Sequence, residues 1–132
     1  MSEEALKIIS DVMEKLGLNY EFMEWTGDRV YQYFTGEYQE VEKPPDSITD
    51  ESKFILSGFA RRQKGKTNPY LSLENAKKKI KKKFNKETGY IVITDTGSVV
   101  AIFYSSSFPV RTVDADLKKI QINLDVMEWS VE

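Results

Sequence analysis

One stretch near the end of the chain, LKKIQINLDVMEWSV, constrains the fold most, because its side chains alternate between apolar and polar. The first apolar members are Ile120, Ile122, Leu124 and Val126, with polar residues between them. A period of two is typical of a β-strand that covers a core with one face only. The stretch therefore predicts a long strand over residues 118–131.

The alternation changes phase after Val126. From there Met127, Trp129 and Val131 are apolar, while Glu128 and Ser130 are polar. Two interpretations stay open. A β-bulge near Val126 would return the later side chains to the core, whereas an uninterrupted strand would point them to the opposite face, to pack on something else.

The remaining elements follow from periodicity and turn residues. Apolar side chains at helical spacing predict helices over 3–16, with Ser2 as N-cap and Gly17 after its end, and over 73–86, with Ser72 as N-cap. β-Branched and aromatic runs predict further strands. These strands are 19–25, 30–41, 53–62, 90–94 and 98–104, the last with an extension towards residue 110. Gly58 suggests a bulge or a close backbone approach, and the polar segment 42–52 a hairpin loop.

This order of elements predicts one α+β domain over residues 1–132. Links of hairpin length favour an antiparallel β-sheet, with two helices packed on one face in the order α-β-β-β-α-β-β-β. No apolar run approaches the roughly 20 residues that a membrane span needs, and no secretory signal is expected from the acidic start.

The chain contains neither cysteine nor histidine. The first absence excludes disulfides, thiolate nucleophiles and cysteine-based metal sites. The second removes the usual general base near neutral pH and the commonest ligand of transition metals. Together these absences remove most hydrolase mechanisms and leave carboxylates, lysines and tyrosines for catalysis, and we expect no metal and no cofactor.

One short motif, Asp95-Thr96-Gly97, matches the catalytic triplet of aspartic proteases. The flanks YIVI and SVVAIF both have strand character, and Asp, Thr and Gly are good turn residues. Aspartic proteases also carry a later apolar-apolar-Gly segment, and no glycine follows Gly97 here. The motif is interpreted as a hairpin turn. The pair Asp114 and Asp116, with Asp125, is likewise interpreted as a turn before the last strand rather than a cation site.

A lysine-rich helix, Lys77–Lys86, offers a second candidate site. Its basic surface is widened by two arginines, so that the candidate residues are Arg61, Arg62, Lys78, Lys79, Lys82 and Lys83. Three interpretations are open: a solvated helix face, a protein partner such as the acidic segment 37–51 of a neighbouring copy, or nucleic acid. The net charge of −2 argues against a dedicated DNA-binding protein.

Aromatic residues crowd into residues 20–38. They are Tyr20, Phe22, Trp25, Tyr31, Tyr33, Phe34 and Tyr38. Most must pack on a core, but two helices cover only one face of a sheet. Aromatics on the other face would form an interaction surface.

Four segments together carry a resemblance to a known family: YFTGEYQEVE, SKFILSGFARR, GSVVAIFYSSSFPV and DADLKKIQINLDVMEWSV. They resemble the tail terminator, or tail-completion (head-tail joining), proteins of long-tailed bacteriophages and prophages of Gram-positive bacteria. The resemblance covers most of the chain, most closely from Lys53 onward, and rests on overall pattern.

The resemblance implies a non-enzymatic virion protein without catalytic residues. Such a protein is assembled in the host cytoplasm and located at the head-proximal end of the tail. It would form a hexameric ring that caps the tail tube, ends polymerisation of the major tail protein and joins the tail to the connector of the head, with DNA passing through. Sequence-specific DNA contacts and membrane contacts are not implied.

Contacts between copies are predicted on the loop 42–52, the segment 105–112 and the last strand. The candidate interface residues there are Glu42, Asp46, Asp50, Phe108, Arg111, Met127, Trp129 and Val131. Three alternatives remain: another head-tail connector, stopper or tail-assembly protein, a nucleic-acid-binding module that uses the lysine-rich helix, and, most distantly, an enzyme whose turnover would depend on Asp95.

Overall fold

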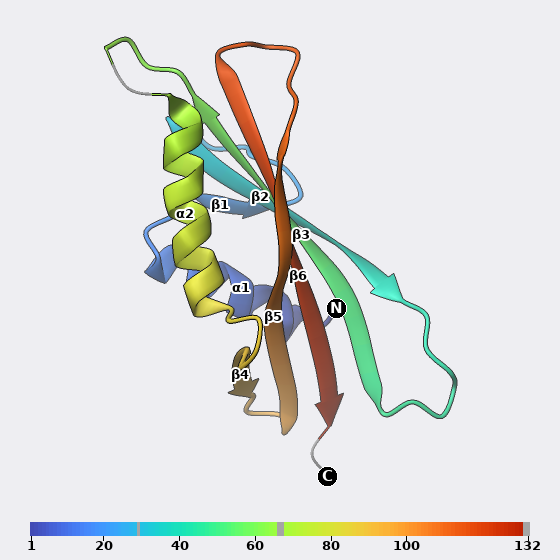
Figure 1. The fold of residues 1–132 in the computed structure, drawn as a ribbon. Coiled ribbons are helices and arrows are strands. Elements are labelled where there is room, and N and C mark those ends of the chain that lie inside the picture. Colours follow the sequence, from blue (N-terminus) through green and yellow to red (C-terminus); the bar gives the residue numbers. More distant parts are fainter. Residues whose placement is uncertain (29, 66–67, 131–132) are drawn as a thin grey trace.

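The computed structural model describes residues 1–28, 30–65 and 68–130, and it has the predicted α+β order (Figure 1). Its helices are α1 (Glu3–Lys15) and α2 (Pro69–Lys83). Its strands are β1 (Tyr20–Phe22), β2 (Gln32–Val41), β3 (Thr49–Arg61), β4 (Tyr90–Ile93), β5 (Ser98–Val110) and β6 (Leu117–Ser130). They form one sheet in the order β1-β2-β3-β6-β5-β4. β3 and β6 therefore lie side by side at its centre, although β4 and β5 come between them in the sequence.

The sheet is antiparallel except at one edge. β1 pairs with β2 in parallel, with Tyr20 opposite Phe34. Hairpin-length links had favoured antiparallel pairing throughout, and that expectation is wrong here. The predicted strand 19–25 ends early because Met23 adopts a positive φ of 72°, and the chain from there to Tyr31 is long enough to cross back.

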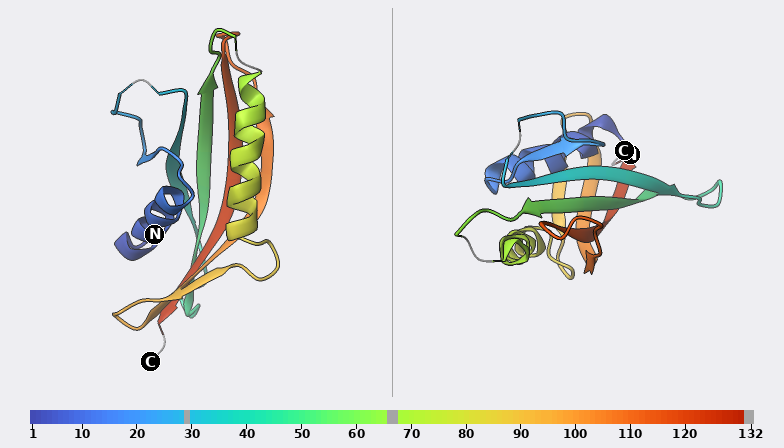
Figure 2. Two further views of the ribbon diagram at one scale, coloured as in Figure 1. Left: turned by 90° about the vertical axis from the view of Figure 1, so that its left-hand side faces the viewer. Right: turned by 90° about the horizontal axis from the view of Figure 1, so that it is seen from above.

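Both helices contribute to a single core on one face of the sheet. Ala5, Ile9, Val12 and Met13 of α1, and Leu73, Ala76 and Ile80 of α2, belong to one buried cluster with alternate residues of the long strands. The strand members include Phe34, Phe54, Leu56, Ile102, Ile120, Ile122, Leu124 and Val126. Figure 2 shows that the sheet twists strongly along its long strands. In the part of the chain that the structure describes, no helix packs on the opposite face, which we call the helix-free face.

The last strand runs without interruption. β6 keeps one register against β3 from Leu117 to Trp129, so the bulge considered near Val126 is absent. The irregularity lies in the neighbouring strand instead, between Tyr104 and Ser106 of β5. β5 continues beyond it to Val110, which confirms the predicted extension. Pro109 is tolerated there because this half of β5 lies at the sheet edge, beyond the end of β4.

The second helix begins one turn earlier than predicted. Its N-cap is Asn68, whose side chain accepts from the backbone N–H of Tyr70 at 2.9 Å, and Pro69 occupies the first turn. The prediction of Ser72 as N-cap is wrong, since proline is well suited to a helix start and extends the helix backwards. The Ser72 hydroxyl instead donates to the carbonyl of Pro69 at 2.8 Å, inside the helix.

Two local predictions concern glycine. Gly97 has a φ of 83° and closes the turn between β4 and β5 by donating to the Thr94 carbonyl at 3.1 Å, which confirms Asp-Thr-Gly as a hairpin turn. Gly58 causes no shift in register, so it marks a close approach rather than a bulge. A Cβ there would lie 2.4 Å from Cε1 of Phe34.

The hairpin between β2 and β3 is tighter than predicted. β3 starts at Thr49, so only residues 42–48 form its loop. Ser47 closes a turn on the carbonyl of Pro44 at 2.9 Å. The polar residues of 49–52 belong to the strand because cross-strand pairing with β6 overrides their weak strand propensity.

Candidate functional site

The helix-free face carries apolar side chains at the end where β4, β5 and β6 meet. Two rows of paired residues cross the strands there. We call them together the apolar patch, and its members are Ile91, Ala101 and Met127 in one row and Ile93, Val99 and Trp129 in the next. Because paired residues share a face, all six lie side by side.

The outer members of the apolar patch are strongly exposed. Ile91 is 58% exposed and Ile93 73%, both on the edge strand β4. Val99 and Ala101 in the middle are buried, although no helix covers this face. Scattered apolar residues are ordinary on a protein surface, but a contiguous group built on rigid strands is typical of an interaction site.

The change of phase in β6 has a simple structural origin. Since the register is continuous, Met127 and Trp129 point away from the core that Val126 enters. The intervening Glu128 points to the helix side. It accepts from the backbone N–H of Ser2 at 3.2 Å and from the Ser2 hydroxyl, at the start of α1. Here a carboxylate is favoured by the helix dipole, which explains a polar residue on the core side.

A polar band separates the apolar patch from the rest of the helix-free face. Lys53 of β3 lies 2.6 Å from Asp125 of β6 and 3.6 Å from Glu51. The hydrogen bond to Asp125 raises the pKa of Lys53, and the hydrogen bond from Lys43 lowers the pKa of Glu51. Both pKa shifts favour the charged forms of Lys53 and Glu51, which give the apolar patch a charged border.

Beyond this band lies a row of stacked aromatic rings. Trp25 stacks on Tyr33 with centroids 5.4 Å apart, and Tyr33 stacks on Phe59 at 5.0 Å. The ammonium of Lys119 lies 5.2 Å from the Phe59 centroid. The rings thus cover one another, and the crowding of aromatics after Tyr20 is explained in part by local packing on this face.

The structure places the predicted interface residues in three separate regions. Met127 and Trp129 lie in the apolar patch, whereas Val131 is outside the described residues. Phe108, which is 45% exposed, lies on the same face and pairs with Gln121 of β6. Gln121 lies six residues from Met127 along this strand, a distance of about 20 Å. Arg111 is exposed at the same end as Phe108, just after β5.

The acidic members of the prediction lie around the hairpin of β2 and β3. Glu42 and Asp46 are exposed in its loop, and Asp50 is exposed on β3 opposite Glu128. The segment predicted at 105–112 is mostly strand rather than a free loop, because β5 continues to Val110. A contact through this segment would therefore use a strand edge.

The predicted basic surface divides into paired and unpaired groups. Arg61 lies 3.2 Å from Asp114 and Arg62 lies 3.5 Å from Asp116, so both arginines are neutralised by the turn before β6. The ammonium of Lys83 lies 5.2 Å from the Tyr90 ring. Among the described residues, the remaining lysines of the prediction are exposed and form no ion pair. They are Lys78, Lys79 and Lys82.

Comparison of the chain with protein families and with curated proteins finds no match. Within the ranges that the structure describes, neither helix is long and apolar enough to cross a membrane.

Sequence reasoning missed the two most exposed members of the apolar patch, Ile91 and Ile93. In YIVI all four residues are apolar, so alternation gives no sign of which face is covered. The available signal was the shortness of the run, since a four-residue strand between a helix and a hairpin commonly lies at a sheet edge.

Proposed function

We propose that this chain is a non-enzymatic structural protein that assembles with itself and with neighbouring proteins of a phage tail. In this role it forms a ring on the head-proximal end of the tail tube, ends tail polymerisation and joins the tail to the head. The observation that supports assembly most strongly is the apolar patch on the helix-free face. The sequence resemblance is the basis for proposing a phage tail as the assembly and its head-proximal end as the position of this chain.

A ring requires a heterologous contact, in which one patch of a subunit meets a different patch of the next and rotation closes the circle. The apolar patch suits such a contact, because it lies on a rigid edge of the sheet and its charged border fixes register. Ile91 and Ile93 point to solvent in the single chain, so their burial would contribute affinity without disturbing the fold.

The experiment is native mass spectrometry of the purified chain over a range of concentrations, combined with cosedimentation on polymerised major tail protein. We expect a closed oligomer of six copies, or binding to the tube end followed by ring closure there. Ile93→Lys should abolish assembly while the melting temperature of the monomer stays within a few degrees, because surface substitutions usually change stability by about 0.5 kcal/mol or less. Trp129→Ala should weaken assembly more than folding.

Val113→Lys is the matched control. Val113 is, like Ile93, an exposed β-branched residue, but it lies in the loop between β5 and β6, away from the apolar patch. This variant should assemble like the wild-type chain. A wild-type chain that stays monomeric and ignores the tail tube would refute the proposed function. A loss of about 3–5 kcal/mol of monomer stability in Trp129→Ala would refute the interface role of that residue.

A connector or stopper of the same particle would use an equivalent ring contact, so the binding partner separates the two roles. Cosedimentation with tail tubes supports the terminator, whereas exclusive binding to the portal-side ring supports the connector. The terminator is the proposal, because the resemblance in length and element order is to that family.

A further inference from the structure

Within the part of the chain that the structure describes, the sheet leaves strand edges without a neighbour on both of its sides. On one side the outer edge of β4 is open, because β4 pairs only with β5. On the other side the second half of β2, residues 37–41, is open, because β1 covers only Phe34 to Gly36. Figure 1 shows β4 at the lower left and the end of β2 at the right. Open edges of this kind accept strands from other chains.

The second half of β2 is open because β1 stops early. Met23 follows β1 with a positive φ of 72°, and its N–H donates to the Gly36 carbonyl at 2.7 Å, where pairing with β2 ends. Three large apolar or aromatic side chains are exposed around this opening: Phe22, Met23 and Tyr38. A strand that entered the opening would cover them. By contrast, the open half of β5 contains Pro109, which cannot donate to an added strand.

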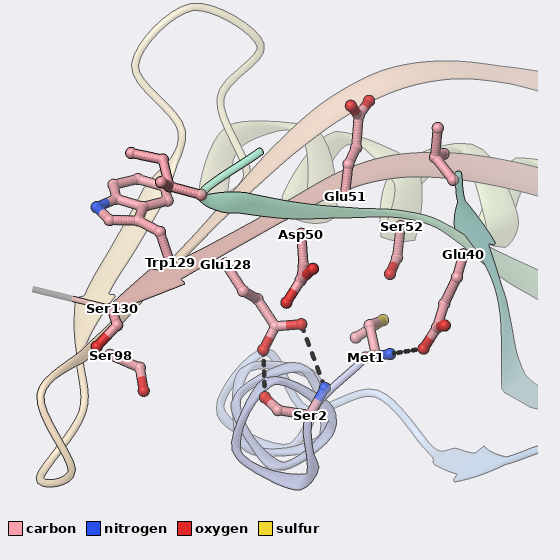
Figure 3. Close-up of a pocket in the computed structure, with 12 residues that line it drawn as sticks. Met1, Ser2, Glu40, Asp50, Glu51, Ser52, Ser98, Glu128, Trp129 and Ser130 are labelled. Atoms are coloured by element: carbon pink, nitrogen blue, oxygen red, sulfur yellow. Dashed lines mark hydrogen bonds and ion pairs between the residues drawn. The ribbon is translucent and has the colours of Figure 1, made fainter. Parts of the chain in front are cut away.

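The bond between Met23 and Gly36 identifies the outward backbone groups of β2. Since these groups alternate along a strand, Tyr38 and Glu40 also direct their N–H and carbonyl groups outward. None of these groups has a hydrogen-bond partner among the described residues. In Figure 3 the side chain of Glu40 points to the α1 side, so that of Val41 points to the helix-free face (Figure 3).

The outward groups of β4 follow from the turn after it. Thr94 donates its backbone N–H to the Ser98 carbonyl of β5 at 2.8 Å, so alternation directs the backbone groups of Ile91 and Ile93 away from β5. Within the described chain these groups have no partner either. The side chains of both isoleucines point to the helix-free face as members of the apolar patch.

The two open edges match in direction and in level. β2 and β4 run in the same direction, because the pairings that lead from one to the other are all antiparallel and even in number. The row of paired residues that begins at Ile91 crosses the whole sheet and ends at Val41. A rotation about an axis roughly parallel to the strands would therefore bring β4 of one copy beside the end of β2 of the next, in parallel and with the same face outward.

Parallel pairing also fits the directions of the backbone groups. In a parallel pair, a residue whose groups face the partner strand lies beside one whose groups face away, as in the pairing of β1 with β2. Ile93 can thus lie beside Val41, and both side chains share the helix-free face. Antiparallel pairing would instead place Ile93 beside Tyr38 or Glu40, whose side chains point to the other face.

We infer that β4 of one copy adds to residues 37–41 of β2 in a second copy as a parallel strand, with Ile93 beside Val41 and Ile91 beside Gln39. This register is shifted by two residues from the level row, which preserves the faces and gives every residue of β4 a partner. Ile93 then donates to the Glu40 carbonyl, and Glu40 donates to the Ile91 carbonyl.

The contact is heterologous, because the two edges are different surfaces, and its repetition makes one continuous sheet around a ring. It rests on the proposed function and names the surface that the apolar patch meets. It also gives a role to the early end of β1, which leaves room on β2 for the strand of the neighbouring copy.

Introduced cysteines test this contact directly, because the chain contains no cysteine of its own. Within one chain, Val41 and Ile93 lie on strands that are four spacings apart, or about 19 Å across the sheet, which is too far for a disulfide. The double variant Val41→Cys with Ile93→Cys therefore forms bridges only between copies. Under mild oxidation, with and without polymerised major tail protein, we expect a covalent ladder up to the full ring.

The matched control is Val113→Cys with Ile93→Cys. Val113 is also exposed, but it lies in the loop between β5 and β6, away from the open edge of β2. Bridges should form at least about tenfold faster in the test variant than in this control, because the contact raises the effective concentration of one thiol at the other. When the single variants Val41→Cys and Ile93→Cys are mixed, only unlike chains should become linked.

The outcomes separate this inference from the proposed function. If the wild-type chain assembles but the double variant bridges no faster than the control, the strand contact is refuted and the ring stands. Rapid dimerisation of Ile93→Cys alone would overturn the inference in favour of two β4 edges that meet across a two-fold axis. If the wild-type chain neither assembles nor binds the tail tube, the proposed function fails. A covalent ladder of the double variant would then still support the strand contact, and its absence would refute that contact as well.

Discussion

The substitution Gly58→Ala tests how closely β2, β3 and β6 pack at the centre of the core. A Cβ at residue 58 would lie 2.4 Å from Cε1 of Phe34 and 2.9 Å from Cγ2 of Ile120. Both neighbours are buried, at 0% and 1% exposure, so neither ring nor methyl group can swing into solvent. Something in the core must shift to admit a single methyl group.

The expected magnitude follows from two opposing effects. Overpacking of a closed core costs about 1–3 kcal/mol. Replacing glycine within a strand recovers about 0.5–1 kcal/mol, because the unfolded chain loses conformational freedom. The net expectation is a loss of about 1–2 kcal/mol in the free energy of unfolding, or roughly 4–8 °C in melting temperature for a domain of this size.

Urea denaturation followed by tryptophan fluorescence measures this loss, with Ser57→Ala as the control. Ser57 is the neighbouring residue on the helix-free face, and its substitution adds no atom to the core. The double variant with Phe34→Leu, which removes the colliding ring, should lose less stability than the sum of the single variants. A neutral or stabilising Gly58→Ala would refute the close approach.

Two further predictions concern single side chains. The Tyr20 hydroxyl is buried without a hydrogen-bond partner in the described chain, so Tyr20→Phe should leave stability unchanged or raise it by about 1 kcal/mol; a clear loss in urea denaturation would contradict this. Burial also raises the pKa of the Tyr20 hydroxyl, because the charged form is disfavoured in the core. The free energy of unfolding therefore does not depend on this group below the ordinary tyrosine pKa of about 10, and it falls as the pH rises above that value. Tyr20→Phe should reduce this fall at high pH. Asn68→Ala should cost about 1 kcal/mol by removing the N-cap of α2, and an unchanged helix stability by circular dichroism melting would place the helix start elsewhere.

Periodicity, β-branched and aromatic runs and turn residues together predicted the number, type and order of the elements. Periodicity was most informative for the helices and for β6, because each has one covered face and shows it in its spacing. The boundaries were less predictable. Asn68 and Pro69 displaced the start of α2 by one turn, and the strand β3 took in residues 49–52 that read as loop. In both cases the deciding interactions were a cap and a cross-strand pairing, which local propensity does not contain.

The candidate site, like the element boundaries, was predictable from the sequence only in part. The phase change after Val126 already indicated that Met127 and Trp129 either leave the core or follow a bulge, and the register of β6 against β3 decided for the former. The neighbours of these residues in the apolar patch, Ile91 and Ile93, were not predictable, since they come from a short apolar run on the far side of β5. The sequence contains the side chains, but strand order brings them together.

The sequence by itself determined the α+β class, the hairpin turn at Asp-Thr-Gly and the change of face in the last strand, because each follows from the spacing of neighbouring residues along one element. Only the tertiary structure decided which surfaces those elements build. Val41 and Ile91 end one row across the sheet, and Ile93, Val99 and Trp129 share another, because pairing between strands distant in sequence aligns them. Contacts of that kind depend on register and strand order, which periodicity along one segment does not specify.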